Sequence, residues 1–559
     1  MSMSLPVLRS IISKRCRAFK RDERGSLLIF SLFVFVTMLV VAGLAVDFMR
    51  VETQRVRLQS TLDRAVLAGA SLEQTLDSET VVRDYFERAG LSAFLDDVKV
   101  TPGTYSKTVE AYASASVRPY FMQMLGLGNI KTRAAGVALE GFSDIEVSLV
   151  VDVSGSMGWT SSISGNVKLD DLKAAAREFV YRIQCNPDTN NLFLDPCTID
   201  PNTVSINLVP YQEQVLVGEA LLQRFNPTNE HTYASCVDFD DTDYNNTAIP
   251  LSGPTQRAGY FDGYSYWYDY QSGSYWPTSY RARDNYRSCR NYSQLEIMPM
   301  EESWTTLVGS INALTAQGGT SIEMGMKWGT ALIDPAFQPA VSAMTGGGTA
   351  PIVAEFANRP SAYGNPSVKK FVVLMTDGEN TYHRELKDAY RDGMSPIWYS
   401  NDRNGNGYTG DEVFSVYRES TGTYRDPIRG YNSGTPYGAN ATQLSYPQLW
   451  KSYNTDFFAN GRYFASGGYW NNDGHTWLEN PVDTFQSDTK NANLLNICAA
   501  ARAQGVTIYT VGFETSVAST SIMKQCASSD SHHFDVDGNS IDDAFAAIAR
   551  NIQKLRLMN

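Results

Sequence analysis

Apolar residues form one long uninterrupted run near the start of the chain. Residues 26–46 carry no charged side chain over 21 positions, which matches the roughly 20 residues that a membrane-spanning helix needs. Apolar or small residues then recur at helical spacing (Val51, Leu58, Leu62, Ala65 and Gly69), and no proline occurs between Pro6 and Pro102. The pattern predicts one long helix that begins with a membrane span. A cleaved signal peptide is the alternative, with Gly43-Leu44-Ala45 as its cleavage site.

A second type of pattern follows the helix. Residues 108–117 alternate strictly between apolar and polar, which is typical of a half-buried strand. A short apolar segment at 121–127 and a second strand-like run at 132–139 follow. We therefore expect residues 48–142 to form a small α+β unit.

From residue 145 onward, strand-like and helix-like segments alternate. The run 145–151 is apolar and β-branched, as in strands that are buried on both faces. Further strands are predicted at 204–209, 371–375 and 506–513, and helices at 172–183, 307–313, 494–503 and 541–555. Such alternation predicts a parallel α/β sheet within residues 143–559.

Two long stretches interrupt this alternation, at about 219–302 and 381–489. They are rich in Tyr, Trp, Gly, Asn and Asp and show neither a helix nor a strand period, so we interpret them as insertions on loops. The first contains a dense aromatic block: Tyr260, Phe261, Tyr264, Tyr266, Trp267, Tyr268, Tyr270, Tyr275, Trp276 and Tyr280. These rings form either a recognition surface or a self-packed core for the insertion.

The distribution of charge sets an orientation for the predicted span. Seven basic residues precede it (Arg9, Lys14, Arg15, Arg17, Lys20, Arg21 and Arg24), against only Asp22 and Glu23. The positive-inside rule then makes residues 1–24 a cytoplasmic tail, 25–47 the transmembrane helix, and the remainder exported. The whole chain has a net charge of −13, which argues against nucleic-acid binding.

Cysteine usage agrees with export. Six of the seven cysteines lie beyond the span: Cys185, Cys197, Cys236, Cys289, Cys498 and Cys526. An even number in an oxidising compartment predicts disulfides, and pairing of neighbours along the chain is the simplest of about 15 connectivities. The spacing contains no Cys-x-x-Cys motif, so a zinc site is not expected.

Candidate chemistry begins directly after the first buried strand. Asp152, Ser154 and Ser156 lie on this loop, Thr320 precedes a predicted helix in Gly318-Gly-Thr-Ser321, and Asp377 follows the strand 371–375. In parallel sheets, ligands gather at the carboxyl ends of the strands. Carboxylate and hydroxyl oxygens suit a hard cation such as Mg²⁺. A Ser-rich turn beside an ordinary Asp-Gly turn is the alternative without a metal.

Together these five residues resemble the metal-ion-dependent adhesion site of von Willebrand factor type A domains. The resemblance implies a doubly wound, mostly parallel, Rossmann-like sheet, here enlarged by the two insertions. It also implies that Ser154, Ser156 and Thr320 bind Mg²⁺, Mn²⁺ or Ca²⁺ directly, and that Asp152 and Asp377 do so directly or through water. The open coordination position would then accept a carboxylate from a protein partner. The two insertions are a departure from the family, and our own hypothesis is that they surround this face and select that partner.

The N-terminal third carries a second resemblance, to TadG-type proteins of the tight-adherence (Flp) pilus-assembly system. The matching segments are Arg21-Asp-Glu-Arg-Gly-Ser26, Gly43-Leu-Ala-Val-Asp47, Leu58-Gln-Ser-Thr-Leu-Asp63 and Ala65-Val-Leu-Ala-Gly-Ala70. That family joins an anchor, a small pilin-like unit and a C-terminal von Willebrand type A domain. The resemblance implies a single-pass inner-membrane protein of a Gram-negative envelope, with its bulk in the periplasm or at the cell surface. Its partners would be components of the pilus or secretion machine.

A second metal loop is predicted within the second insertion. Asp402, Asn404 and Asn406 occupy the first, third and fifth places of an opening typical of calcium loops, with Gly407 sixth. The twelfth place is Val413 rather than Glu, so Tyr408, Asp411 or Glu412 would have to complete a shorter Ca²⁺ site. A polar Asn-Gly turn is the equal alternative.

The sequence favours a binding protein over an enzyme. It contains no Walker phosphate loop, no His-Glu-x-x-His and no Gly-x-Ser-x-Gly elbow, and only five histidines. The expected function is metal-dependent protein binding in pilus assembly or anchoring. Two alternatives remain: a surface adhesin that uses the same metal site on host or matrix ligands, and a structural scaffold whose metal site does not bind partners.

Overall fold

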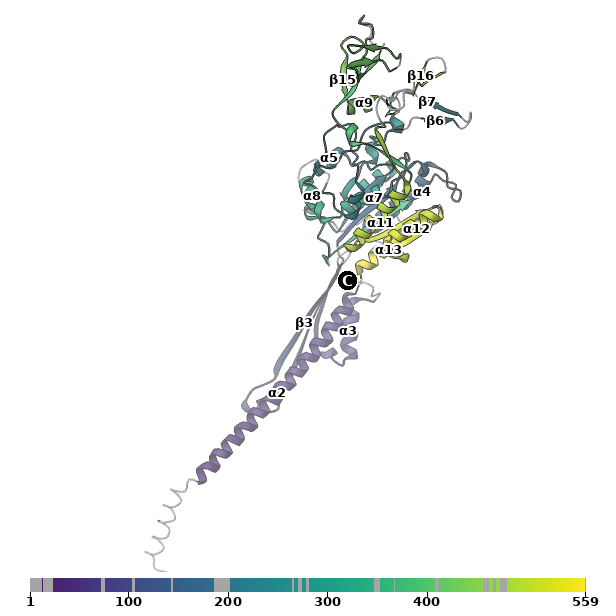
Figure 1. The fold of residues 1–559 in the computed structure, drawn as a ribbon. Helices are drawn as coiled ribbons and strands as arrows, with labels where there is room; N and C mark the ends of the chain where they lie inside the picture. The colour runs from purple at the N-terminus through teal and green to yellow at the C-terminus, as the bar shows by residue number, and fades with distance from the viewer. Residues whose placement is uncertain are drawn as a thin grey trace, which may run out of the picture. The chain divides into compact units, whose positions relative to one another are not determined.

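The chain forms two compact units, Met1–Phe142 and Ser143–Asn559, which we describe separately (Figure 1). The computed structural model describes residues 13, 24–71, 76–102, 106–141, 144–184, 202–263, 266–269, 274–277, 281–345, 352–365, 367–407, 412–427, 429–455, 458, 462–465, 469–472 and 480–557.

The first unit is built on one long helix, α2 (Arg24–Ala70). Its first half is almost entirely exposed, and from Leu27 onward it is long and apolar enough to cross a membrane. Its second half buries Leu58, Leu62, Ala65 and Val66 against the rest of the unit. The predicted continuation of the apolar run into a packed helix is confirmed.

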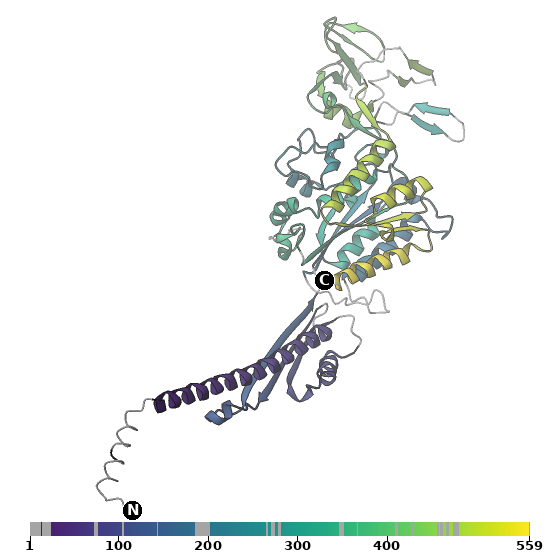
Figure 2. The same ribbon diagram turned by 60° about the horizontal axis from the view of Figure 1, so that its bottom comes forward.

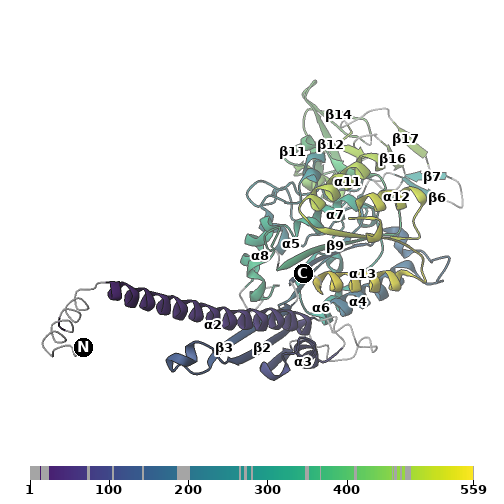
Figure 3. The ribbon, with the colours of Figure 1, turned by 90° about the horizontal axis from the view of Figure 1, so that it is seen from below.

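A three-stranded antiparallel sheet packs against this second half (Figure 3). Its order is β1-β2-β3, with Val109, Ala111, Ala113 and Ala115 of β2 buried on the face toward the helix, as the alternation predicts. The elements of this unit are β1 (Leu95–Pro102), β2 (Ser106–Val117), β3 (Ile130–Gly141), α3 (Ser78–Arg88) and the 3₁₀ helices η1 (Ser92–Phe94) and η2 (Met122–Leu125).

The second unit contains a six-stranded sheet in the order β20-β19-β9-β4-β5-β8. All neighbouring strands are parallel except β5 and β8, so the predicted mostly parallel sheet is confirmed. The strands are β4 (Asp144–Asp152), β5 (Val204–Tyr211), β8 (Met298–Glu301), β9 (Val368–Thr376), β19 (Thr507–Phe513) and β20 (His533–Val536). β4 and β9 lie side by side, with Val151 opposite Met375.

Helices cover both faces of this sheet (Figure 2). One face packs against α4 (Lys168–Gln184), α6 (Trp304–Ala313) and α13 (Ile541–Leu557), and the other against α7 (Ile322–Ala331), α8 (Gln338–Met344), α11 (Ser487–Ala503) and α12 (Val517–Cys526). The helix α7 lies close to the strands because it carries glycine where it meets them. A Cβ on Gly325 would lie 2.6 Å from the Tyr211 ring.

Both insertions contribute to a separate core. The second insertion folds into a five-stranded sheet, β14-β13-β12-β11-β15, and is closed at its base by pairing of β10 with β18. Phe261 of the first insertion is buried with Phe414, Trp450 and Tyr453 of the second. Arg287 of the first also donates a 2.8 Å hydrogen bond to the Lys451 carbonyl of the second. The two insertions therefore stabilise each other.

The elements of the insertions are short. They are α5 (Glu219–Leu222), β6 (Tyr266–Asp269), β7 (Ser274–Pro277), β10 (His383–Leu386), β11 (Met394–Ser400), β12 (Val413–Arg418), β13 (Thr423–Arg425), β14 (Asn432–Ser433), β15 (Thr442–Ser445), α9 (Tyr446–Ser452), β16 (Arg462–Ala465), β17 (Tyr469–Asn472) and β18 (Val482–Phe485). The 3₁₀ helices of the second unit are η3 (Gly155–Gly158), η4 (Gln223–Phe225), η5 (Asp241–Asn245), η6 (Asp284–Tyr286), η7 (Ser293–Leu295), η8 (Pro335–Phe337), η9 (Ala354–Asn358), η10 (Asp388–Tyr390) and η11 (Asp530–His532).

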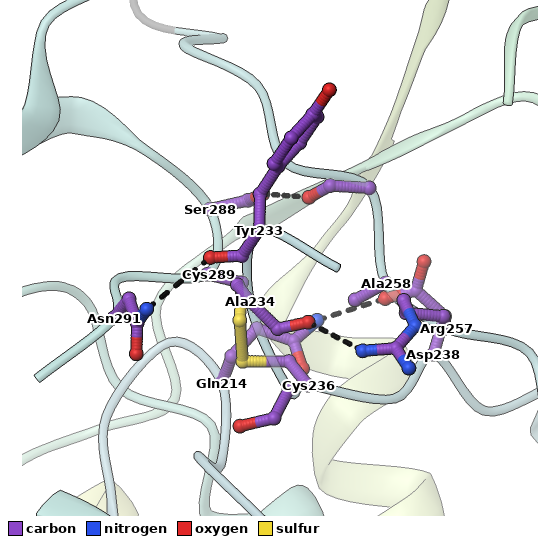
Figure 4. Close-up of a disulfide and its surroundings, with 12 residues drawn as sticks. Gln214, Tyr233, Ala234, Cys236, Asp238, Arg257, Ala258, Ser288, Cys289 and Asn291 are labelled. Atoms are coloured by element: carbon purple, nitrogen blue, oxygen red, sulfur yellow. Dashed lines mark hydrogen bonds between the residues drawn. A yellow bond between two sulfur atoms is a disulfide. The ribbon is translucent and has the colours of Figure 1, made fainter. Parts of the chain in front are cut away.

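Two of the three predicted disulfides are confirmed. Cys236 is bonded to Cys289 within the first insertion, and Cys498 of α11 to Cys526 of α12. Figure 4 shows the first bridge beside Arg257, whose guanidinium donates a 2.8 Å hydrogen bond to the Ala234 carbonyl. The third predicted pair, Cys185 with Cys197, lies outside the described residues.

The side chains of the aromatic block are described only at its start. Phe261 belongs to the shared core, and the Tyr260 ring lies 4.1 Å from the guanidinium of Arg287. Both contacts agree with the packing interpretation of the block. The side chains from Tyr264 to Tyr280 lie outside the described part of the chain.

Candidate functional site

Asp152 is the last residue of β4 and lies fully buried at the carboxyl end of the sheet. Its Oδ1 accepts a 2.8 Å hydrogen bond from the backbone N–H of Ser154, and its Oδ2 accepts one of 2.7 Å from the Thr376 hydroxyl. Burial raises the pKa of the Asp152 carboxyl to about 7, and the negative charge of Asp377 adds to this rise. An unpaired carboxylate at this position is therefore costly, and a cation would relieve the cost.

The two serines and the second aspartate meet beside it. Ser154 and Ser156 place their hydroxyl oxygens 3.1 Å apart, and the Ser156 hydroxyl donates a 2.6 Å hydrogen bond to Oδ1 of Asp377. Because β4 and β9 are parallel neighbours, the residues that follow them emerge at the same edge of the sheet. The predicted convergence of these side chains is thus found in the structure.

The loop that carries Thr320 is bonded to the Asp152 loop through the backbone. Gly155 N–H donates to the Gly318 carbonyl at 3.0 Å, and Gln317 N–H donates to the Val153 carbonyl at 2.8 Å. Gly318 has a φ of +79°, a left-handed conformation that favours glycine. The buried Thr320, two residues later, therefore belongs to the same edge as Asp152 and Asp377.

Residues that the sequence analysis missed hold Thr320 in place. Its backbone N–H donates a 2.8 Å hydrogen bond to the Thr381 hydroxyl, and its carbonyl accepts one of 2.8 Å from the ammonium of Lys490. The same ammonium donates to the Thr381 carbonyl at 2.7 Å and to the Ser321 hydroxyl at 2.6 Å. Lys490 is itself buried, so one lysine of α11 joins the Thr320 loop to the segment after β9.

Lys168, at the start of α4, is a second missed residue. Its ammonium donates a 3.1 Å hydrogen bond to Oδ2 of Asp377 and lies 3.7 Å from the Glu514 carboxylate. It thus occupies the Asp377 oxygen that Ser156 leaves free. A lysine at a helix start has no sequence signal that would assign it to this site, because only the docking of α4 brings it there.

The donor set fits a hard divalent cation. Asp152, Ser154, Ser156 and Asp377 are linked by contacts of hydrogen-bond length, and all offer oxygen, the ligand atom that Mg²⁺ and Ca²⁺ prefer. In the part of the chain that the structure describes, no group of three or more His, Cys, Asp or Glu could hold a metal. This does not conflict with the candidate site, because hydroxyls supply most of its donors.

A cavity of about 360 Å³ opens next to the Thr320 loop. It is lined by Gly318, Gly319 and Thr381 from the loops at the site, and by residues on either side of them: Glu213, Tyr286, Arg290 and Tyr382. Tyr286 and Arg290 come from the first insertion. The insertion therefore contributes side chains directly beside the candidate metal loops.

The proposed calcium loop is only partly described. Both oxygens of Asp402 accept backbone hydrogen bonds, from Asn406 at 3.1 Å and Gly407 at 2.8 Å, and Glu412 forms an ion pair of 2.9 Å with Arg281. Tyr408 and Asp411 lie outside the described residues. The turn is present, and calcium binding stays a prediction.

Residues 25–72 match the family model of putative Flp pilus-assembly TadE/G-like proteins. The vWF domain of the type V pili tip protein Mfa5 from Porphyromonas gingivalis is 15% identical, with 74% of this chain and 97% of that chain covered and a TM-score of 0.30. The PilB minor pilin from Streptococcus sanguinis is 12% identical, with 83% and 78% covered and a TM-score of 0.27. No curated protein matches the chain.

The second unit agrees with the fold that the sequence resemblance to von Willebrand factor type A domains implies. It has a mostly parallel sheet with helices on both faces, and the three candidate loops lie at one edge of that sheet. The chain therefore carries a segment at residues 25–72 that matches the TadE/G-like Flp pilus-assembly family model, and its second unit has a doubly wound, mostly parallel α/β fold.

Proposed function

We propose that this protein is a membrane-anchored binder that holds a protein partner through a divalent cation during assembly or anchoring of a Flp-type pilus. The observation that carries the proposal is the meeting of Asp152, Ser154, Ser156 and Asp377 at one edge of the sheet, next to the Thr320 loop. The TadE/G-like domain supports the link to pili.

Asp152, Ser154, Ser156, Thr320 and Asp377 would hold the cation, preferably Mg²⁺. Three of the five donors are neutral hydroxyls and two are carboxylates, and an open coordination position of the cation would accept a carboxylate of the partner. Lys168 keeps Asp377 oriented, and Lys490 keeps the Thr320 loop against the segment after β9. These residues position groups for binding, and the proposal includes no chemical reaction.

The location follows from α2. Its apolar part would span the inner membrane, with the basic residues 1–24 in the cytoplasm and the second unit in the periplasm or at the cell surface. The two disulfides agree with an oxidising compartment.

The test is a titration of the chelator-treated full-length protein with Mn²⁺, followed by electron paramagnetic resonance. We expect one tight site per chain, and Thr320→Ala and Asp377→Asn should each weaken it by about tenfold or more. Asp402→Asn, in the separate candidate calcium loop, serves as the matched control and should leave this site unchanged. Wild-type affinity in both Thr320→Ala and Asp377→Asn would refute the metal site.

A capture experiment distinguishes a metal-dependent binder from a structural scaffold. Pilus components captured from envelope extract by the wild type should be lost with chelator and with Thr320→Ala. Capture that is unchanged in both would favour a scaffold whose contacts come from the insertions.

A further inference from the structure

A short segment that follows β2 is fixed to α2 where the apolar run of the helix ends. The carboxylate of Asp47, the first charged residue after that run, accepts hydrogen bonds from three consecutive backbone N–H groups. These belong to Tyr120 (2.8 Å), Phe121 (2.7 Å) and Met122 (2.8 Å). Asp47 is buried beneath the segment. Charge-assisted hydrogen bonds of this kind hold the backbone firmly, so the position of the segment along the axis of α2 is fixed.

Contacts one turn before and one turn after Asp47 fix the segment at the same position along the axis of α2. One turn earlier, Gly43 leaves space for Phe121, since a Cβ there would lie 2.5 Å from the ring. One turn later, the guanidinium of Arg50 lies 3.8 Å from the ring centroid of Tyr120. The segment thus covers helix positions 43–50, about 10 Å along the axis.

The outer surface of the segment is apolar. Met124 is 84% exposed, Tyr120 65% and Leu127 53%, although all three are large apolar or aromatic residues. The apolar residues of α2 just before Gly43, such as Val41, are exposed as well. The apolar surface therefore continues from the helix onto the segment, which marks an interaction surface.

We infer that residues 118–127 are a second membrane contact, which inserts Tyr120, Met124 and Leu127 into the outer headgroup layer of the bilayer. The inference rests on the proposed membrane span of α2. If the apolar run lies in hydrocarbon, Asp47 lies at its outer boundary, and the segment held there lies at headgroup depth. Tyrosine is enriched at that depth, and the neighbouring cations Arg50 and Arg118 suit lipid phosphates.

The segment would fix the depth of α2 in the bilayer. A lone apolar helix can slide or tilt by small amounts at little cost. A side contact bonded to the helix at Asp47 opposes both movements, because Met124 and Leu127 would have to leave or enter the headgroup layer.

The test uses the full-length protein in phosphatidylethanolamine–phosphatidylglycerol vesicles, with the photoreactive residue p-benzoylphenylalanine at one position at a time. Met124 reports on the segment, and Phe33 reports on the span itself. Val137 is the matched control, since it is 63% exposed on β3. Two residues before it, the Ala135 carbonyl accepts a hydrogen bond from the Gln59 side chain, which lies 12 residues beyond Asp47 and thus about 18 Å further along α2.

We expect lipid adducts at Phe33 and Met124 and none at Val137. Lipid adducts at Phe33 alone would overturn the inference and leave the span intact, whereas none at Phe33 would overturn the span. A protein adduct at Met124 in place of a lipid adduct would also overturn the inference.

A variant of the attachment provides a second test. Asp47→Ala removes the acceptor of all three hydrogen bonds, so lipid labelling at Met124 should fall by at least about threefold. Labelling at Phe33 should not change. Unchanged labelling at Met124 in Asp47→Ala, with faster hydrogen exchange at residues 120–122 as proof of release, would overturn the inference that the attachment to Asp47 holds the segment in the headgroup layer.

Discussion

The hydroxyl of Ser156 donates a 2.6 Å hydrogen bond to the carboxylate of Asp377, 221 positions later in the chain. Ser156 lies in the turn after β4 and Asp377 directly after β9. The contact exists only because the two strands are parallel neighbours in one sheet. The presence of this hydrogen bond therefore indicates that the candidate site is assembled.

Ser156→Ala removes both a proposed metal donor and the hydrogen bond that orients Asp377. We expect Mn²⁺ affinity to fall by about 10- to 100-fold, with little change in the melting temperature of the metal-free protein because Ser156 is only half-buried. Titration calorimetry measures the first quantity and differential scanning fluorimetry the second. Ser310→Ala, a hydroxyl on α6 away from the site, is the control and should bind Mn²⁺ like the wild type.

Asp152→Asn should stabilise the metal-free protein at neutral and higher pH. Burial raises the pKa of Asp152 from 3.8 to about 7. Between these values the folded protein holds a proton that the unfolded chain has released, so stability falls as pH rises and levels off above about pH 7. Asparagine has no such loss, and a rise in pKa from 3.8 to about 7 corresponds to a difference on the order of 4 kcal/mol at pH 8.

This prediction is measured by unfolding in chelator at pH 5 and pH 8. The wild type should lose more stability than Asp152→Asn across that range, and the variant should no longer bind Mn²⁺. Parallel pH profiles for the two proteins would contradict the assignment of a strained, buried carboxylate at position 152.

Lys490→Met removes the ammonium that donates to the carbonyls of Thr320 and Thr381 and that lies 3.6 Å from Glu323. Removing one partner from a buried charged network typically costs about 3–5 kcal/mol. We therefore expect faster hydrogen exchange in the Thr320 and Thr381 loops, together with weaker Mn²⁺ binding.

Lys524→Met provides the comparison for this change. Its ammonium pairs with Asp530 at the surface, so the change should cost no more than about 0.5 kcal/mol. If both variants exchange at the wild-type rate in the Thr320 loop, Lys490 does not hold that loop.

Removal of the Cys498–Cys526 bridge should lower stability without affecting the metal site. The bridge closes a segment with a separation of 28 residues between α11 and α12, and its loss as the Cys498→Ala, Cys526→Ala double variant should cost about 2–4 kcal/mol. Thermal unfolding measures the cost. A peptide map that links either cysteine to Cys236 or Cys289 would show the pairing to be wrong.

The sequence was sufficient for the sheet and for most of the site. Long apolar runs such as 145–151 and 371–375 identify buried strands, and parallel strands bring the residues after them to one edge. The sequence alone therefore predicted that Asp152, Ser156 and Asp377 lie close together. Neighbour pairing of cysteines succeeded for two bridges because each closes a short local loop.

Contacts that depend on how helices dock could not be predicted in this way. Lys168 and Lys490 lie at the starts of helices, where lysines are usually solvated, and only the packing of α4 and α11 turns them inward. The sequence also did not predict the core that the two insertions share, because Phe261 and Phe414 belong to segments with no regular hydrophobic period. The attachment of residues 120–122 to Asp47 pairs a helix with a loop that lies 73 to 75 positions later.

Pairing of β10 with β18 joins the two ends of the second insertion, with His383 opposite Phe485. Everything between them leaves and re-enters the second unit at one place, so changes in this region can leave the six-stranded sheet unchanged as long as the core shared with Phe261 of the first insertion is kept. A graft between β10 and β18 that preserves this shared core would therefore test what the region contributes to partner recognition without rebuilding the candidate cation site.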